Sequence, residues 1–336
     1  MAKTWITKEI TLENGEIVKA QAPIIISASR ATDIPAFFSD WFRYRFEKGY
    51  IKWFNPFNNK PLYVSFDNTR LIVFWSKNPR PIISHLDFFE SQNINYYFQY
   101  TLNDYEKEGL EKGVPNISER IKTFADISNR IGKDRIVWRF DPLLITRELN
   151  KDTLLNRVQK LGDKLVKYTN KLVFSFADIS SYRKVKSNLD NDGVQYLEFN
   201  TEIMEYMAER IGKMVKDWGI EAGTCSEKID LDKFGIKHNK CIDDELIIRN
   251  FRKDEKLMEF LGVDAQPSLF GDDEIDSTKL KDKGQREDCG CIMAKDIGQY
   301  NTCVHQCTYC YANASKELAM KNFKKYKENP NGESIL

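Results

Sequence analysis

Three cysteines stand close together near the C-terminal end of this chain, spaced as Cys303-x3-Cys307-x2-Cys310. A 4Fe–4S cluster normally takes four thiolates, one for each iron. Three cysteines on one short loop can therefore bind three irons and leave the fourth iron open to another ligand. Structural zinc sites usually pair two cysteines with a second pair at a distance, and no His or Cys follows Cys310. The spacing favours an open 4Fe–4S cluster, with zinc and a redox or disulfide role as the alternatives.

The chain holds four further cysteines, and two of them flank a glycine. They are Cys225, Cys241, Cys289 and Cys291. Cys289 and Cys291 are too close in sequence for an ordinary disulfide, and Gly290 allows the sharp turn that would point both sulfurs at one centre. Four thiolates can fill the corners of a second, closed 4Fe–4S cluster or make one structural zinc site. We expect the closed cluster, with zinc or unligated buried cysteines as the alternatives.

The residues around the cysteine triplet read Tyr300-Asn-Thr-Cys303-Val-His-Gln-Cys307-Thr-Tyr-Cys310-Tyr-Ala-Asn313. This run resembles the cluster loop of the radical S-adenosylmethionine superfamily, including the aromatic residue directly before the third cysteine. The resemblance implies that the open iron binds the amino and carboxylate groups of S-adenosylmethionine. It also implies that the reduced cluster cleaves this cofactor to a 5′-deoxyadenosyl radical, which takes a hydrogen atom from the substrate. His305, inside the loop, is expected to lie next to the ligands or at the surface rather than to bind metal.

A second resemblance covers nearly the whole chain. It rests on Ile26-Ser-Ala-Ser-Arg30, on Gly284-Gln-Arg-Glu-Asp-Cys289-Gly-Cys291 and on Asp296-Ile-Gly-Gln-Tyr300. These strings are similar to an uncharacterised bacterial family, the domain of unknown function 1848 (DUF1848), which carries such a cysteine cluster at its C-terminal end. Because this family is uncharacterised, the expected function of the chain is inferred from the cysteine loop alone.

The charge balance limits the classes of partner. The chain has 336 residues with 51 Lys and Arg and 50 Asp and Glu, which gives a formal net charge of +1. This excludes a globally basic nucleic-acid-binding protein but not a local basic groove. No apolar run approaches the roughly 18–20 residues that span a membrane, and the start of the chain lacks the apolar core of a signal peptide. We therefore expect a cytoplasmic protein.

Short apolar runs recur along the chain, and helical patterns follow them. The candidate strands are residues 24–28, 71–75, 95–100, 136–140, 172–176 and 220–224. Continuous apolar runs of this kind are typical of parallel strands covered on both faces. Residues 117–131 and 203–215 carry apolar side chains at helical spacing after Asn116 and Asn200. Alternating strands and helices predict a parallel (β/α) barrel, partial or closed, with a doubly wound open sheet as the alternative.

The cysteine loop lies near the C-terminal end, whereas the superfamily it resembles usually carries it after the first barrel strand. We infer a circular permutation, in which residues 292–327 supply the customary first strand, cluster loop and first helix beside the strand at 24–28. The expected parts are a barrel core at 1–250, a charged excursion at 251–288 and a cysteine-rich segment at 289–336 that completes the barrel. An inserted hairpin is expected at residues 50–54 and 62–66.

Ligands of parallel α/β folds bind at the carboxyl ends of the strands, so polar residues there are candidate cofactor contacts. They are Ser27, Ser29, Arg30, Tyr100, Arg139 and Asp178. Because a buried guanidinium needs a partner, Arg139 either pairs with Asp141 or Asp178 or clamps a carboxylate or phosphate. The Gly-Gly-Glu strand that many radical enzymes use for the cofactor's amino group is absent. Residues 27–30 occupy the matching position in a permuted chain, and no catalytic residue is assigned.

The resemblance to radical enzymes implies reduced flavodoxin or ferredoxin as the electron donor. The substrate class stays open between nucleic acid, a peptide or protein, and a small molecule; residues 41–50 combine aromatic and basic side chains that could stack on bases. The pentapeptide Gln266-Pro-Ser-Leu-Phe270 resembles the motif by which bacterial DNA-repair proteins bind the sliding clamp, with an ordinary loop as the alternative. A non-enzymatic iron–sulfur or zinc-binding protein is the alternative to an enzyme.

Overall fold

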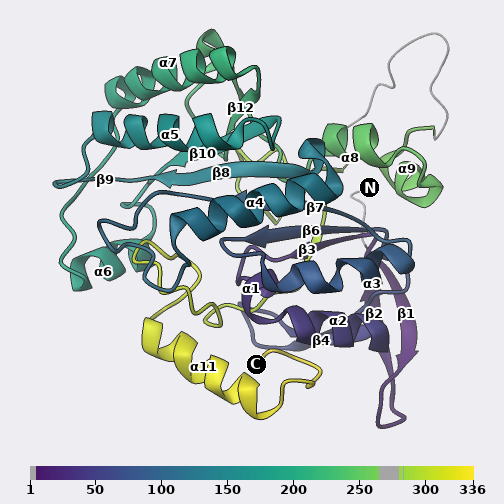
Figure 1. The fold of residues 1–336 in the computed structure, drawn as a ribbon. Coiled ribbons are helices and arrows are strands. Elements are labelled where there is room, and N and C mark those ends of the chain that lie inside the picture. Colours follow the sequence, from purple (N-terminus) through teal and green to yellow (C-terminus); the bar gives the residue numbers. More distant parts are fainter. Residues whose placement is uncertain (1–4, 265–279, 283) are drawn as a thin grey trace.

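The computed structural model describes residues 5–264, 280–282 and 284–336 (Figure 1). In this part of the chain, an eight-stranded parallel sheet forms the centre, in the order β13-β12-β10-β8-β7-β6-β3-β14. Its strands are β3 (Ile25–Ala28), β6 (Leu71–Ser76), β7 (Asn95–Thr101), β8 (Ile136–Leu143), β10 (Lys171–Phe176), β12 (Glu221–Thr224), β13 (Ile236–His238) and β14 (Lys295–Asp296). Because β13 and β14 stand at opposite edges, the described strands form an open sheet, and closure into a barrel is not observed.

Six strands of this sheet coincide with the apolar runs predicted from the sequence; they are β3, β6, β7, β8, β10 and β12. β3 is buried along its whole length and β6 almost so, as expected for strands covered on both faces. The edge strand β13 was not predicted, because it is three residues long and Lys237 and His238 are exposed. The mixed α/β class and the large parallel sheet are therefore as predicted.

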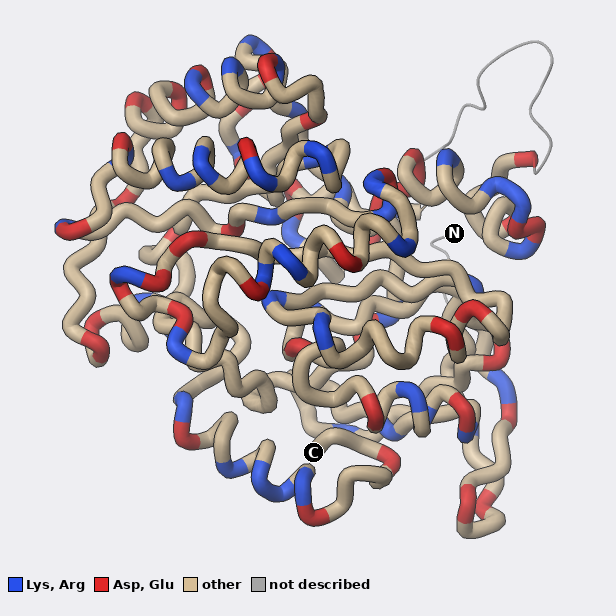
Figure 2. The backbone as a smooth tube through the Cα atoms, in the orientation of Figure 1, with Lys and Arg blue, Asp and Glu red and all other residues tan. Residues whose placement is uncertain are grey.

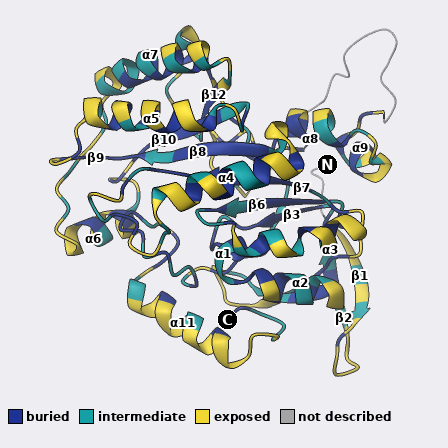
Figure 3. Ribbon diagram, viewed as in Figure 1, coloured by how far each residue is buried: buried dark blue, intermediate teal, exposed yellow. Residues whose placement is uncertain are grey.

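One face of the sheet, called the outer face below, carries side chains such as Phe74 and Phe98. These side chains form one continuous apolar core with the surrounding helices. The helices of this core are α1 (Ile34–Phe37), α2 (Ser39–Lys48), α3 (Leu86–Ser91), α4 (Ile117–Ile131), α5 (Lys151–Leu165), α6 (Arg183–Asn191), α7 (Thr201–Trp218) and α11 (Lys316–Glu328). The predicted caps Asn116 and Asn200 accept backbone hydrogen bonds at the starts of α4 and α7. The longer helices α4, α5 and α7 bury one side toward the core and expose the other (Figure 3).

The opposite, inner face carries side chains such as Val73 and Tyr97 and belongs to a second apolar core. The helices α8 (Asp244–Phe251) and α9 (Glu255–Leu261) join this core. Arg70 and Asn95, at the amino ends of β6 and β7, both donate hydrogen bonds to the carboxylate of Asp254, which caps α9. The two helices therefore lie at the amino-end edge of the sheet, and the opposite edge is left to the cysteine loop.

The sequence places residues 251–288 in an exposed excursion, and the structure differs at residues 255–261. These residues form α9, and their apolar side chains Leu257, Met258 and Leu261 are buried. A seven-residue helix is too short for its periodicity to stand out in a charged stretch. Residues 265–279, with the pentapeptide that resembles a clamp-binding motif, lie outside the described residues.

The C-terminal segment joins the sheet next to β3. β14 runs parallel to β3, with Lys295 opposite Ile26 and Asp296 opposite Ser27. The inferred permutation predicts this neighbour, although the paired segment is only two residues long. The cysteine loop and α11 follow β14, and α11 packs against α1. The last elements of the chain thus lie beside the first strand of the parallel sheet.

A smaller sheet has the order β1-β2-β5-β4. Its strands are β1 (Ile6–Thr11), β2 (Ile17–Ala22), β4 (Tyr50–Phe54) and β5 (Pro61–Ser65). β4 and β5 form the predicted hairpin, and the β1–β2 hairpin was not predicted. The remaining described elements are β9 (Ile145–Thr146), β11 (Tyr196–Leu197), and the 3-10 helices η1 (Pro81–His85), η2 (Lys133–Arg135) and η3 (Asp232–Phe234). Within the described ranges, no helix has the length and apolar character needed to cross a membrane.

Candidate metal centres

The loop from Cys303 to Cys310 lies at the carboxyl-end edge of the parallel sheet (Figure 1). Gly113, in the connection after β7, donates its N–H to the His305 carbonyl oxygen at 2.8 Å. Asn188 of α6, which follows β10, donates to the Cys310 carbonyl oxygen at 3.1 Å. Because both partners follow carboxyl ends of strands, the loop lies where parallel α/β folds bind their ligands.

The three sulfurs of this loop are shielded from solvent. Cys307 is buried, and Cys303 and Cys310 are half-buried. Burial raises the pKa of the Cys307 thiol well above its ordinary value, and nearby Glu111 and the two other thiols add to the rise. Burial also raises the pKa of Cys310, against the opposing effect of backbone N–H groups at residues 312 and 313. Such thiols resist ionisation on their own and are favoured as thiolates once a metal replaces the protons.

Asp33 connects the cysteine loop to two strands. Its carboxylate accepts hydrogen bonds from Ser76 Oγ at 2.7 Å and from the Lys77 N–H at 2.8 Å, at the end of β6. The same carboxylate lies 2.7 Å from Nε2 of His305, and Nδ1 of that ring lies 3.2 Å from the Gly113 carbonyl oxygen. His305 therefore supports the loop through a buried contact with the ends of β3, β6 and β7.

A second buried network centres on Glu111. Its carboxylate lies 2.7 Å from Lys77 Nζ and 3.3 Å from Arg120 Nη1. It also accepts hydrogen bonds from Asn103 at 3.1 Å and from the hydroxyl of Tyr309, the aromatic residue before the third cysteine. Burial raises the pKa of Glu111, but the two cations outweigh burial and hold this pKa below its ordinary value. The sequence did not predict this network, because its members come from separate segments that only folding brings together.

The other four cysteines approach one another near β12, β13 and the segment before β14. Cys225 follows β12 and Cys241 follows β13, and their Sγ atoms are 3.6 Å apart. Cys291 Sγ accepts hydrogen bonds from the backbone N–H of Cys241 at 3.2 Å and of Ile242 at 3.4 Å. Contact with the Cys291 side chain lowers the pKa of Cys289. The fold thus gathers the four sulfurs that were predicted to share one centre.

Arg139 lies beside this four-cysteine group, with 2% of its surface exposed. Its Nη1 donates to Cys241 Sγ at 3.0 Å and to Gln99 Oε1 at 3.1 Å, and its Nη2 pairs with Asp141. The guanidinium lies 5.2 Å from the centroid of the Trp75 ring. Pairing with Asp141 was one of the two predicted roles, and the contact with Cys241 was not foreseen. A cation that donates to sulfur favours the thiolate, so this position suits a negatively charged metal–thiolate centre.

Three of the candidate cofactor contacts meet Asp296 of β14. Its carboxylate accepts hydrogen bonds from Ser27 Oγ at 3.0 Å, from Ser29 Oγ at 2.6 Å and from the Arg30 N–H at 2.8 Å. The two hydroxyls therefore hold β14 against β3. The Arg30 guanidinium lies 5.6 Å from the Trp75 ring centroid. Its Nη2 is 3.7 Å from the Asp282 carboxylate and makes no hydrogen bond within the described chain.

One of the two further candidates is placed differently from expectation. Tyr100 points to the outer face, where its ring stacks on Phe124 of α4 and its hydroxyl donates to a backbone carbonyl of that helix at 3.1 Å. Adjacent strand residues point to opposite faces, so Gln99 rather than Tyr100 faces the four-cysteine group. Asp178 is exposed and accepts hydrogen bonds within its own turn. Tyr100 therefore points away from the four-cysteine group, whereas Asp178 follows the carboxyl end of β10 as expected and stays a predicted contact.

The chemistry of the donors fits iron–sulfur or zinc binding, because all the predicted ligands are thiols. In the residues described, no group of three or more His, Cys, Asp or Glu side chains is arranged to hold a single metal ion. A four-iron cluster does not require this, because each thiolate binds a different iron. The 3.6 Å between the Cys225 and Cys241 sulfurs is nevertheless close to the roughly 3.8 Å between sulfurs around one tetrahedral zinc. For the four-cysteine group, one structural zinc ion therefore remains the alternative to a closed 4Fe–4S cluster.

A parallel sheet with helices packed on both faces, three thiols on a loop at its carboxyl-end edge and four more thiols gathered near its inner face defines a cysteine-rich α/β protein. The chain matches the family model described as "Domain of unknown function (DUF1848)" over residues 25–312 and belongs to that family. No curated protein matches the chain. The crystal structure of a candidate α-L-fucosidase from Bacteroides thetaiotaomicron shares 10% identity over 59% of this chain and 75% of that one, with a TM-score of 0.22. A likeness this low supports no inference about fold or activity.

Proposed function

We propose that this chain is a radical S-adenosylmethionine enzyme whose open 4Fe–4S cluster is held by Cys303, Cys307 and Cys310. The observation that carries the proposal is the position of these cysteines on one shielded loop at the carboxyl-end edge of a parallel sheet. The buried networks of Asp33 and Glu111 support this loop from two sides. Three thiolates on a loop leave one iron for a small-molecule ligand.

Together, the cluster and S-adenosylmethionine would supply homolytic cleavage of the S–C5′ bond and a 5′-deoxyadenosyl radical for hydrogen abstraction. The part of the protein is to hold and orient the reactants and to exclude water. Trp75 Nε1 is a buried donor without a hydrogen-bond partner among the described groups, and Arg30 Nη2 makes only a 3.7 Å ion pair with Asp282. A buried donor without a hydrogen bond is unfavourable, so we assign both to polar groups of the cofactor. Ser27 and Ser29 act indirectly, since they fix the backbone of Arg30 through Asp296.

For the group of Cys225, Cys241, Cys289 and Cys291, we propose a second, closed 4Fe–4S cluster that relays electrons from reduced flavodoxin or ferredoxin in the cytoplasm. Hydrogen bonds from Arg139 and from backbone N–H groups to these sulfurs favour a negatively charged centre. Anaerobically reconstituted protein should hold about eight irons, and about four after Cys303, Cys307 and Cys310 are changed to Ala together. Stoichiometric zinc with about four irons in the wild type would exclude the second cluster and spare the first.

The test of the enzymatic function is mass spectrometry for 5′-deoxyadenosine. Dithionite-reduced, reconstituted protein should convert S-adenosylmethionine to 5′-deoxyadenosine and methionine slowly without any substrate, because the open iron needs only the cofactor. Cys307→Ala should abolish this conversion. Undiminished cleavage in that variant would refute the assignment. Metal-loaded wild type that never cleaves S-adenosylmethionine would identify a non-enzymatic iron–sulfur or zinc-binding protein instead.

A further inference from the structure

Three tyrosines stand around the cysteine loop and are called the tyrosine platform below. Tyr182 caps the start of α6, Tyr300 precedes the loop, and Tyr311 directly follows Cys310. Tyr300 and Tyr311 are 38% and 47% exposed, and the ring centroids of Tyr182 and Tyr311 are 6.4 Å apart. Tyr300 joins the group through α6, because Nζ of Lys184 on that helix lies 5.6 Å from the centroid of the Tyr300 ring. The three rings therefore form one group beside the proposed cluster.

The tyrosine platform is held in place. The Tyr311 hydroxyl donates a hydrogen bond to the Arg30 carbonyl oxygen at 2.8 Å. This bond fixes the hydroxyl end of the Tyr311 side chain, while part of the ring stays exposed. The helix that carries Tyr182 is tied to the cysteine loop, because Thr308 of the loop donates to Asp192 at 2.6 Å. A fixed aromatic ring loses little conformational entropy when it contacts a ligand. This surface is thus prepared for a planar partner.

Cations lie along the same edge. Lys184 Nζ is 5.6 Å from the centroid of the Tyr300 ring. Arg286 is exposed, and although burial lowers its pKa, the nearby Tyr182 hydroxyl and other anionic groups raise this pKa overall. Glu227 also lies near Arg286, so the edge carries both signs of charge. Elsewhere in the described chain, Lys and Arg are interspersed with Asp and Glu (Figure 2).

The segment at residues 41–50, which the sequence offered as a base-stacking surface, presents less of such a surface than expected. It lies in α2 and the start of β4, and Trp41, Phe42, Arg45 and Tyr50 are buried in the core. The combination of exposed rings and cations is found instead at the tyrosine platform. An acidic peptide would satisfy the cations and leave the rings without a planar partner, whereas bases and phosphates satisfy both.

We propose that the tyrosine platform, with Lys184 and Arg286, binds the bases and phosphates of a single-stranded nucleic acid, which is the substrate class of this protein. The proposal rests on the proposed function, because it places the strand next to the open cluster. Stacking on aromatic side chains tolerates any base, and the phosphates meet the cations. The net charge of +1 is compatible with such a local site.

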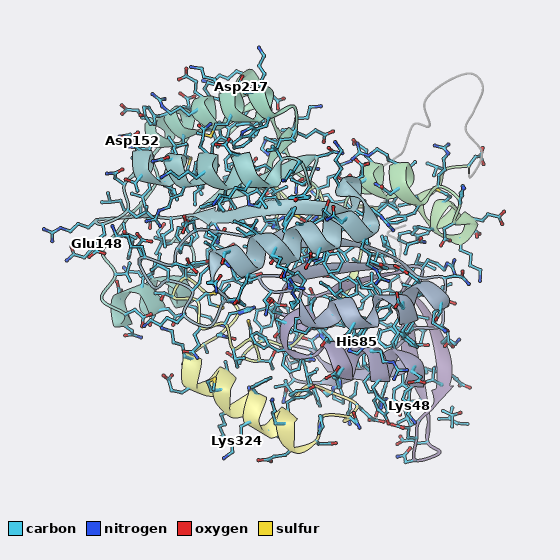
Figure 4. All side chains as sticks on the ribbon, viewed as in Figure 1. Lys48, His85, Glu148, Asp152, Asp217 and Lys324 are labelled. Atoms are coloured by element: carbon cyan, nitrogen blue, oxygen red, sulfur yellow. The ribbon has the colours of Figure 1, made fainter. Side chains whose placement is uncertain are left out.

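The test measures fluorescence anisotropy of dye-labelled single-stranded DNA and RNA of roughly 12 nucleotides with the reconstituted protein. Tyr182→Leu and Tyr300→Leu should each raise Kd roughly 5- to 100-fold, and Tyr182→Phe should keep wild-type affinity because it keeps the ring. Lys184→Gln and Arg286→Gln should each lower the slope of log Kd against log salt by about 0.7. The matched control is Tyr206→Leu on α7. Tyr206 also has a cation near its ring, because Lys151 Nζ lies 5.0 Å from the ring centroid. The Tyr206 hydroxyl donates a hydrogen bond to Asp152, which Figure 4 labels at the start of α5, away from α6 and the cysteine loop.

Wild type that binds neither oligonucleotide, or leucine variants that bind as well as wild type, would overturn the proposal. So would an equal loss of affinity in Tyr206→Leu. Each variant is checked by circular dichroism, and Tyr182→Phe keeps the test valid if a leucine variant misfolds. Cleavage of S-adenosylmethionine without oligonucleotide binding would overturn this proposal alone. Oligonucleotide binding by protein that never cleaves S-adenosylmethionine would overturn the proposed function and keep the binding surface.

Discussion

Replacing Gly113 with alanine should displace the cysteine loop and leave the parallel sheet in place. Gly113 donates its N–H to the His305 carbonyl oxygen at 2.8 Å. A Cβ on Gly113 would lie 2.7 Å from the carbonyl oxygen of Val304 and 2.8 Å from that of His305. Real Cβ atoms essentially never approach another heavy atom so closely, and both oxygens belong to the backbone. No side-chain rotation can relieve the contact, so the loop itself must move.

The size of the effect follows from these contacts. Overpacking in a well-packed region typically costs about 1–3 kcal/mol, and loss of the Gly113–His305 hydrogen bond adds about 0.5–1.5 kcal/mol. Together they favour the displaced loop by about 1.5–4.5 kcal/mol, which is roughly a 10- to 2,000-fold change in its population. Metal binding must work against this change, because the three cysteines have to return to their positions.

The assay compares iron content and 5′-deoxyadenosine formation after anaerobic reconstitution. Gly113→Ala should keep about four irons at the other centre and lose most of the loop cluster and its activity. Gly109→Ala is the matched control in the same connection. A Cβ on Gly109 meets nothing within 4 Å, and its φ of +61° costs an alanine only about 1–2 kcal/mol locally. Full iron content in Gly113→Ala, or the same iron loss in both variants, would refute the reasoning.

Two further substitutions test the buried networks. Glu111→Gln leaves Lys77 and Arg120 without their shared carboxylate, and breaking a buried pair of this kind costs about 3–5 kcal/mol. Urea unfolding should show this loss of unfolding free energy, and an unchanged value would contradict the network. Arg139→Met removes the donor to Cys241 Sγ and a positive charge beside it, so the reduction potential of the four-cysteine centre should become more negative, with partial recovery in Arg139→Lys. Redox titration followed by electron paramagnetic resonance measures this shift, and equal potentials in wild type and Arg139→Met would exclude the role.

The strands were predictable because each apolar run is buried on both faces, which leaves a continuous signal in the sequence. The hairpin β4–β5 and the helices α4 and α7 were predictable from turn residues, caps and apolar periodicity. The same continuity explains the misplacement of Tyr100. When both faces of a strand are apolar, nothing in the run tells which alternate residues point toward the metal centres and which point toward α4.

Part of the candidate site could also be predicted from the sequence, because part of it depends only on spacing along the chain. Cysteine spacing alone groups Cys303, Cys307 and Cys310 on one loop, because neighbours along the chain must be neighbours in space. Contacts between distant segments have no such constraint. The pairing of Asp33 with His305 and the meeting of Lys77 and Arg120 at Glu111 depend on strand order and on which loops share an edge.

The sequence by itself therefore determined the class of fold, most strands of the parallel sheet, the helices α4 and α7, and the thiols available for metal. Those properties depend on local periodicity and on spacing along the chain. Only the tertiary structure decided which polar groups surround the thiols and which aromatic rings stay exposed beside them. Parallel strands gather their carboxyl ends at one edge, so residues hundreds of positions apart become neighbours there through register and packing. The tyrosine platform belongs to this second kind, because exposure of a ring depends on what the rest of the chain covers.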